Sequence, residues 1–445
     1  MLIKLPSLIA ILFILSSMPL VSQSADTIFP YVYQESILDN GLKVITIPMD
    51  SPGLVSYYSI VRTGSRDEYE KGYTGFAHFF EHMMFRGTKK YPGSAYDKII
   101  TEIGADANAY TSNDLTCFHL DFTKADLKTV MELESDRFQN LWYTEEAFKT
   151  EAGAVHGEYL KSLSNPWYAL YEKLMDTAFD VHTYKHMVIG FRKDIEAMPT
   201  MYTYSQSFFK RYYRPENVIL LIAGDINPNE TLDLVKKYYG QWEKGYVPPE
   251  ITKEPEQTAE RRAEVAFNGK TLPILYMAYK SLPFDPADIE MAACYLIGEL
   301  IFGETSDLYQ KLVLDEQRVE SLDPDFTSAR DVNLMGVSAE IKKENDIDDV
   351  EREIIQAISH FQKEPVDIKK LNDLKNHLKY QFLMDLDTPA KVADNLARII
   401  AMTGAIEAVD QLYSSFEKVT PEDILKAAND FLISRKRTVV VLKGR

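Results

Sequence analysis

The chain has 445 residues, 45% hydrophobic and 26% charged, which is the balance of an ordinary globular protein of about two or three domains. Its formal net charge of −18 argues against nucleic acids and anionic membrane surfaces as partners, because both are negatively charged. The two cysteines, Cys117 and Cys294, form no C-x-x-C pair and are too few for a disulfide framework. We interpret both as buried free thiols.

Residues 1–24 have the composition of a secretory signal peptide. Lys4 supplies a positive charge, Leu8–Leu15 is apolar throughout, and small residues offer a cleavage site near Ser24 or Ala25. A membrane anchor is the alternative, but the apolar stretch is short for a membrane span. We therefore expect an exported protein, periplasmic or secreted, without a membrane attachment after cleavage.

Residues 29–243 are predicted to form a first domain of mixed strands and helices. Two short strands flank Asn40-Gly41, a dipeptide typical of hairpin turns. A strand at 54–62 leads to a helix around 76–85, and extended stretches at 104–111 and 115–122 follow. We expect a buried strand at 217–225 and helices at 94–103, 125–141, 145–163, 167–179 and 229–239.

A polar stretch with prolines, residues 244–262, predicts a linker, and residues 263–445 then repeat the order of strands and helices. The expected strands lie near 265, 275–279, 326, 336–341 and 438–442, and the expected helices at 286–302, 306–317, 346–361 and 366–384. This pattern favours an α+β fold of two structurally similar domains, each a mostly antiparallel sheet covered by helices on one face.

The segment 76–85 contains His78, Glu81 and His82 among apolar residues. On a helix the two histidines lie one turn apart on one face, with Glu81 beside them. A buried group of this kind is costly without a partner, which a divalent metal would supply; the alternative is two core histidines satisfied by hydrogen bonds. H-x-x-E-H is the inverzincin pattern, in which the Glu is the general base.

Catalytic zinc normally takes three protein ligands, so a third must come from elsewhere. Glu151 and Glu158 are seven residues apart in a predicted helix and project from nearly the same face. One of them can bind metal while the other supports the site. Taken alone, either Glu would be interpreted as a solvated helix charge. His182 and His186 repeat the helical spacing but lack an acidic base, so no second zinc site is expected.

H-x-x-E-H followed by E-x6-E resembles the pitrilysin, insulysin and mitochondrial-processing-peptidase family of zinc metallopeptidases. The resemblance begins at Asp39-Asn40-Gly41-Leu42 and weakens after the linker. It implies one zinc per chain, held by His78, His82 and Glu158, with Glu81 as general base and Glu151 supporting a ligand. It also implies a clamshell of two similar domains that closes a chamber against a second such unit.

In this family a peptide substrate adds as a strand to a sheet edge, and Asn108 and Ala109 match the positions that hold its backbone. A turn-forming role is the alternative for Asn108. Relatives also place an Arg and a Tyr, spaced R-x6-Y, at the site from the second domain, whereas this sequence has Val313 and Glu320 there.

Either a homologous partner supplies the missing Arg and Tyr, or full activity has been lost. We favour the partner, in a heterodimer or alternatively a homodimer. The sequence thus predicts an exported zinc endopeptidase for short or unfolded peptides, acting as the catalytic half of a heterodimer. A scaffold subunit with little or no activity is the alternative.

Overall fold

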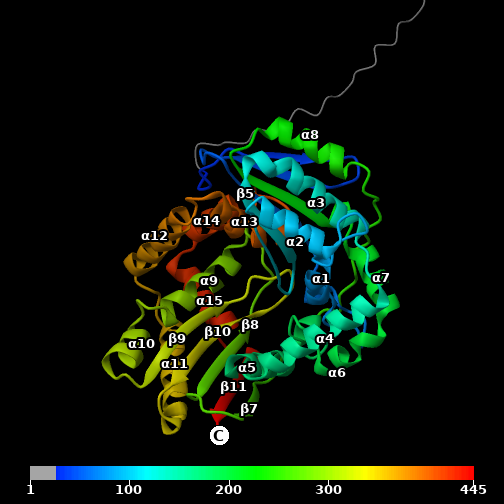
Figure 1. Ribbon diagram of the computed structural model, residues 1–445. Coiled ribbons are helices and arrows are strands. Elements are labelled where there is room, and N and C mark those ends of the chain that lie inside the picture. The colour runs from blue at the N-terminus through cyan, green and yellow to red at the C-terminus, as the bar shows by residue number, and fades with distance from the viewer. Residues whose placement is uncertain (1–26) are drawn as a thin grey trace, which may run out of the picture.

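The computed structural model describes residues 27–445, which fold into two halves, each built on its own β-sheet (Figure 1). The predicted signal peptide, residues 1–24, lies outside the described residues. Within 27–445, no helix combines the length and the apolar character that a membrane crossing requires. Cys117 and Cys294 are both buried and free, as expected from the sequence.

The first sheet has six strands in the order β1-β2-β6-β3-β5-β4, and only the β2–β6 pair is parallel. Every residue of β6 is buried, which explains the continuous apolar run of its sequence. Strand β4 lies at an edge of the sheet. The strands are β1 (Gln34–Ile37), β2 (Lys43–Pro48), β3 (Leu54–Val61), β4 (Asp106–Thr111), β5 (Thr116–Thr123) and β6 (Val218–Gly224).

Helices of the first half pack on one face of this sheet around a large aromatic core. Two of them, α6 and α7, were not predicted: α6 is short, and α7 is rich in Tyr and Phe, which favour strands. The helices of this half are α1 (Phe76–Met84), α2 (Gly93–Glu102), α3 (Leu127–Asn140), α4 (Glu145–Ser162), α5 (Pro166–Ala178), α6 (Arg192–Ala197), α7 (Tyr202–Tyr212) and α8 (Pro228–Tyr239).

The second sheet has five strands in the order β7-β11-β8-β10-β9, and only β7–β11 is parallel. Strand β7 begins within the predicted linker. The strands are β7 (Arg261–Phe267), β8 (Ile274–Lys280), β9 (Val319–Phe326), β10 (Leu334–Ile341) and β11 (Arg437–Gly444).

The helices of the second half are α9 (Ile289–Phe302), α10 (Asp307–Tyr309, continued by a π-helix to Asp315), α11 (Ile347–Phe361), α12 (Ile368–Met384), α13 (Pro389–Thr403), α14 (Glu407–Lys418) and α15 (Pro421–Phe431). The last three were not predicted.

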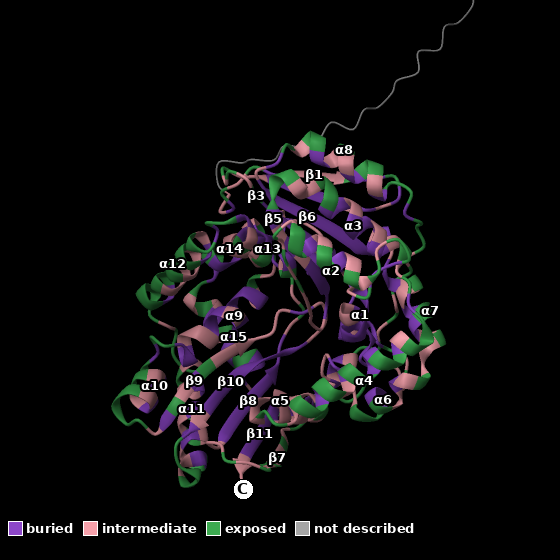
Figure 2. Cartoon of the chain, viewed as in Figure 1, coloured by how far each residue is buried: buried purple, intermediate pink, exposed green. Residues whose placement is uncertain are grey.

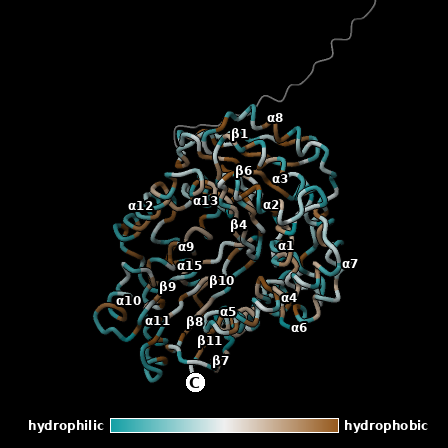
Figure 3. The backbone as a smooth tube through the Cα atoms, viewed as in Figure 1, coloured by the Kyte–Doolittle hydropathy of each residue, from teal (hydrophilic) through white to brown (hydrophobic). Residues whose placement is uncertain are grey.

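The two halves exchange helices. Helix α13 of the second half packs against β3 and β6 of the first sheet, and α5 of the first half packs against β7 and β11 of the second sheet. Each sheet is therefore covered on one face by helices of its own half and on the other face by a helix of the other half. Figure 2 shows that the strands of both sheets are largely buried. In Figure 3 the outer helix α12 is largely hydrophilic, in contrast to the strands. Packing thus crosses the predicted linker, and the division into domains remains a prediction.

Charged side chains also join the halves. Arg330, in the loop between β9 and β10, donates from Nη2 to Asp67 over 2.8 Å and from Nε to Asp114 over 2.9 Å. Its neighbour Asp331 accepts a hydrogen bond from Arg66 and lies 3.1 Å from Nε2 of His182. The Asp67 and Asp114 side chains are almost fully buried, so Arg330 compensates charges that would otherwise be costly.

Candidate metal centre and active site

Helix α1 carries the H-x-x-E-H segment and packs between α4 and the edge strand β4. It begins after Gly75, whose φ of 93° lies in the left-handed region. A Cβ at this position would stand 2.4 Å from the carbonyl oxygen of Ile189, so only glycine fits. The close packing of Gly75 against Ile189 fixes where the first helical turn begins, and with it the position of His78.

Glu68 caps α1 from outside the helix. Its carboxylate accepts hydrogen bonds from the backbone N–H groups of Gly75 over 2.7 Å and Ala77 over 2.6 Å, two donors that a helix start leaves unpaired. Burial raises the pKa of Glu68 to about 8. The Nε2 atom of His186 lies 3.8 Å from this carboxylate, and burial lowers the pKa of His186 to about 4. Glu68 was not identified from the sequence, because a loop separates it from the helix that it caps.

His78, His82 and Glu158 converge. Nε2 of His78 lies 3.7 Å and Nε2 of His82 3.4 Å from the same Glu158 oxygen, Oε2, and one ligand atom from each residue lies within 4.8 Å of the others. Ligands about 2.1 Å from a tetrahedral zinc ion are separated by about 3.4 Å, so this donor set fits zinc with little adjustment. Within residues 27–445 it is the one group of at least three His, Cys, Asp or Glu side chains able to hold a metal.

The protonation preferences of the two histidines differ. Burial, reinforced by the neighbouring His82, lowers the pKa of His78 to about 4, so its imidazole is neutral, the form that binds metal. The hydrogen bond with Glu151 raises the pKa of His82. In the neutral ring the single proton lies on Nδ1, 2.9 Å from Oε1 of the charged Glu151, which leaves the unprotonated Nε2 directed to Glu158.

Glu151 supports the site from a buried position, with 3% of its surface exposed. Its second oxygen accepts a hydrogen bond from Nε of Arg86 over 2.5 Å. Burial opposes its ionisation, but His82 and Arg86 together lower the pKa of Glu151. The carboxylate is therefore charged and holds the His82 ring in one orientation, as carboxylates commonly do behind metal-binding histidines. Arg86 was not identified from the sequence.

Glu81 lies beside the cluster, on the side of β4. Its Oε2 accepts a hydrogen bond from the Thr111 hydroxyl over 2.6 Å, and burial is the main cause of its raised pKa. Thr111 was missed in the sequence, although strand alternation puts residues 107, 109 and 111 on one face. The hydrogen bond from Thr111 thus fixes the Glu81 carboxylate next to the proposed metal position.

Asn108 and Ala109 lie on the free edge formed by β4. Asn108 is exposed, and its Oδ1 accepts a hydrogen bond from the N–H of Ala109 over 2.8 Å. Ala109 pairs with Phe118 and shares the face of the sheet that packs on α1, whereas Asn108 pairs with His119 on the opposite face. The structure therefore puts both residues at the edge but only Ala109 on the side of Glu81.

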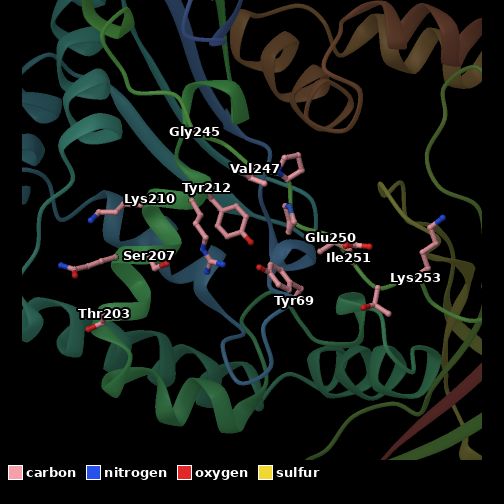
Figure 4. A pocket seen from close by; sticks show the side chains of 15 residues that line it. Tyr69, Thr203, Ser207, Lys210, Tyr212, Gly245, Val247, Glu250, Ile251 and Lys253 are labelled. Atoms are coloured by element: carbon pink, nitrogen blue, oxygen red, sulfur yellow. The ribbon is translucent and has the colours of Figure 1, made fainter.

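The structure gives Val313 and Glu320 other roles. Val313 packs against the core of the second half, and Glu320 pairs with Lys342 over 3.3 Å. A separate cavity of about 1280 Å³ lies between α7 and the segment 245–253; its lining includes Tyr69, Lys210 and Lys253 but none of the proposed site residues (Figure 4).

Two protein-family models match the chain. The model described as insulinase (peptidase family M16) matches residues 50–190, and the model described as peptidase M16 inactive domain matches residues 203–378. A zinc protease, PqqE, of Helicobacter pylori is 28% identical over 92% of this chain and 93% of its own.

Two further relatives cover most of the chain. A probable mitochondrial-processing peptidase subunit beta of Arabidopsis thaliana is 22% identical over 89% of this chain and 76% of its own length. A crystal structure of a protease from Helicobacter pylori superposes with a TM-score of 0.87 at 26% identity, over 93% of this chain and 99% of the other. The two family models together span both halves, and the chain belongs to the insulinase family of M16 peptidases.

Proposed function

We propose that this chain is an exported zinc-dependent endopeptidase that cleaves short or unfolded peptides. One observation carries the proposal: three metal-binding atoms, from His78, His82 and Glu158, converge beside the Glu81 carboxylate and next to a free strand edge. The relative from Helicobacter pylori named a zinc protease supports the reaction class. Residues 1–24 support export.

The three proposed ligands would hold one zinc ion per chain, which when bound polarises water and the scissile carbonyl. Glu81 accepts the proton of the attacking water and delivers it to the leaving amine. Its raised pKa makes it a stronger base than an exposed carboxylate, and the Thr111 hydroxyl keeps it in place. Glu151 holds the His82 ring, so the ligand geometry does not depend on substrate.

The substrate binds as an added strand on β4. Among the described residues β4 pairs only with β5, so its other edge offers backbone N–H and C=O groups to an extended peptide. Ala109 and Thr111 lie on the side of this edge that faces α1, which brings the peptide past Glu81. Short or unfolded peptides present such a strand readily, because their backbone groups are not already paired within a fold, and we take these to be the substrates.

A homologous subunit completes the active site. Neither Val313 nor Glu320 can donate a hydrogen bond to the developing oxyanion, which a peptidase normally stabilises with such donors. We propose that a partner chain with R-x6-Y provides them in a heterodimer, with a homodimer as the alternative. The Arabidopsis relative, named as one subunit of a processing peptidase, supports this arrangement.

A scaffold subunit with little or no activity is the second candidate. The match of residues 203–378 to a model described as an inactive domain favours it, because that region contains Val313 and Glu320. A scaffold does not require stoichiometric zinc.

Metal analysis together with a peptidase assay tests the proposal. The purified mature chain should contain about one zinc ion, and its hydrolysis of unfolded peptides, alone or with a homologous partner, should stop with a chelator and return with zinc. His82→Ala should lose both zinc and hydrolysis. A folded protein without bound zinc, or hydrolysis that persists in chelator, would contradict the proposal.

A further inference from the structure

A cavity of about 220 Å³ lies where the edge strand β4 ends. Its walls come from both halves of the molecule: the turn between β4 and β5, the loop between β9 and β10, and helix α13. The residues that line it include Thr111, Asp114, Thr327, Ser328 and Arg398. With a water molecule occupying about 30 Å³, the space accommodates a side chain such as that of glutamate.

The cavity adjoins the proposed catalytic group. Thr111 lines it and also donates its hydroxyl hydrogen bond to Glu81. A peptide that extends β4 at its free edge continues past Thr111 toward this cavity, because a strand advances only about 3.3 Å per residue. The cavity therefore lies within a few residues of Glu81 along the course of such a peptide.

Arg398 is the unpaired cation of this cavity. Its side chain is exposed on α13, and within residues 27–445 it forms no hydrogen bond and no ion pair. Asp394 lies one helical turn away on the same helix, but no ion pair joins the two. An arginine that lines a cavity without a protein partner has its five N–H donors available to a ligand.

The other polar groups of the cavity favour an anion. Within the described chain, no hydrogen bond engages the hydroxyls of Thr327 and Ser328, and both can donate. Asp114 is the acidic residue of the lining, and its charge is compensated by Arg330, which donates to it over 2.9 Å, and by the Tyr184 hydroxyl at 3.0 Å. The cavity thus combines a free guanidinium with neutral donors and an acid that is already paired.

We propose that this cavity is a substrate subsite in which Arg398 binds a carboxylate of the peptide. The inference rests on the proposed peptidase function, since it takes the peptide to lie along β4. The carboxylate comes either from an acidic side chain or from the C-terminus of the substrate. Arg398 is then a specificity residue contributed by the second half of this chain, and its position does not correspond to that of Val313 or Glu320.

A peptide series measures this preference. Each labelled peptide carries one Glu at a different position, with a matched Gln peptide, and each is made with a free or an amidated C-terminus. Cleavage is measured with the active assembly, and binding with the Glu81→Gln chain, by fluorescence anisotropy. At one position, or at the free C-terminus, we expect the carboxylate to improve binding and cleavage by about 5- to 20-fold, as for a partly exposed charge-assisted pair.

Three variants assign the preference to Arg398. In Arg398→Gln the carboxylate and amide peptides should differ by less than about 2-fold, and Arg398→Glu should favour Lys at the same position. Lys391→Gln, an exposed charge on the same helix, is the matched control and should keep the preference. All three replace exposed side chains, so unchanged melting temperatures are expected.

The outcomes separate the two proposals. If Arg398→Gln discriminates as strongly as the original chain, or if no position discriminates, the subsite assignment is overturned. If binding depends on Arg398 but no assembly cleaves any peptide, the subsite stands and the peptidase function fails.

Discussion

Nδ1 of His82 donates a hydrogen bond to Oε1 of Glu151 over 2.9 Å, and this contact turns the other ring nitrogen, Nε2, toward Glu158. The seven-residue spacing in α4 allows His82 to contact both glutamates, because the buried Glu151 and the exposed Glu158 are two turns apart on one side of the helix. One glutamate thus faces the protein interior and orients a histidine, while the other remains free to bind metal.

Replacing Glu151 should weaken zinc binding without abolishing it. In Glu151→Gln the His82 ring loses a charged acceptor, and we expect about a 10- to 100-fold loss in zinc affinity or turnover. Zinc affinity is measured by competition with a chelator. Glu146→Gln, an exposed change on the same helix, is the control. Unchanged affinity and turnover in Glu151→Gln would reduce Glu151 to a structural residue.

Glu68 should make the stability of the chain depend on pH. Its folded pKa of about 8 exceeds the ordinary value of 4.5, so the folded state holds the proton more tightly than the unfolded state. Its contribution to stability is complete below pH 4.5 and is lost as the pH rises through 8. We expect the melting temperature of the original chain, measured in chelator, to fall relative to Glu68→Gln between pH 5 and 8. A constant difference between the two proteins would refute this assignment.

The interaction of Arg330 with Asp67 and Asp114 should hold the two halves together. Arg330→Ala removes the nearest cation from two buried carboxylates and leaves only the longer contacts of Arg66, 3.2 Å to Asp67 and 3.9 Å to Asp114; we expect a loss of about 3 kcal/mol in the free energy of unfolding. Urea unfolding provides the measurement. Arg352→Ala, at an exposed position on α11, should cost under about 1 kcal/mol. Equal effects of the two substitutions would show that the interface does not depend on Arg330.

The isolated chain should be a poor enzyme. Loss of one oxyanion donor typically costs about a hundred- to a thousand-fold in rate, and both usual positions lack a donor here. Mixing the chain with an exported homologue that has R-x6-Y should restore activity, and dilution should then reduce it. Full activity from the isolated chain, independent of its concentration, would exclude the heterodimer.

The sequence predicted most elements that have regular periodicity. Helical spacing put His78, Glu81 and His82 together on one helix, and the resemblance to a known family added Glu158 from a second helix. Residues whose partners lie far away in sequence could not be predicted. Thr388, Pro389 and Gly404 mark the ends of α13, so this helix could have been identified. Its packing on the first sheet could not, since each half presents apolar residues without indicating which sheet they cover.

Site residues whose partners lie far away in the sequence could not be predicted either. Thr111 follows Ala109 by two residues, and strand alternation would have placed both on one face. Glu68 and Arg398 carry no local signal, because their roles follow from the tertiary approach of a loop to α1 and of α13 to β4.

The most direct test of the central claim is the Glu81→Gln variant, assayed for zinc content and peptide hydrolysis in the same preparation. Glu81 is proposed to move a proton and not to bind metal, so the variant should retain about one zinc ion per chain while hydrolysis is lost, with Glu146→Gln as the unaffected control. Zinc loss as complete as in His82→Ala, or hydrolysis at the original rate, would contradict the assignment of Glu81 as the general base of a zinc peptidase.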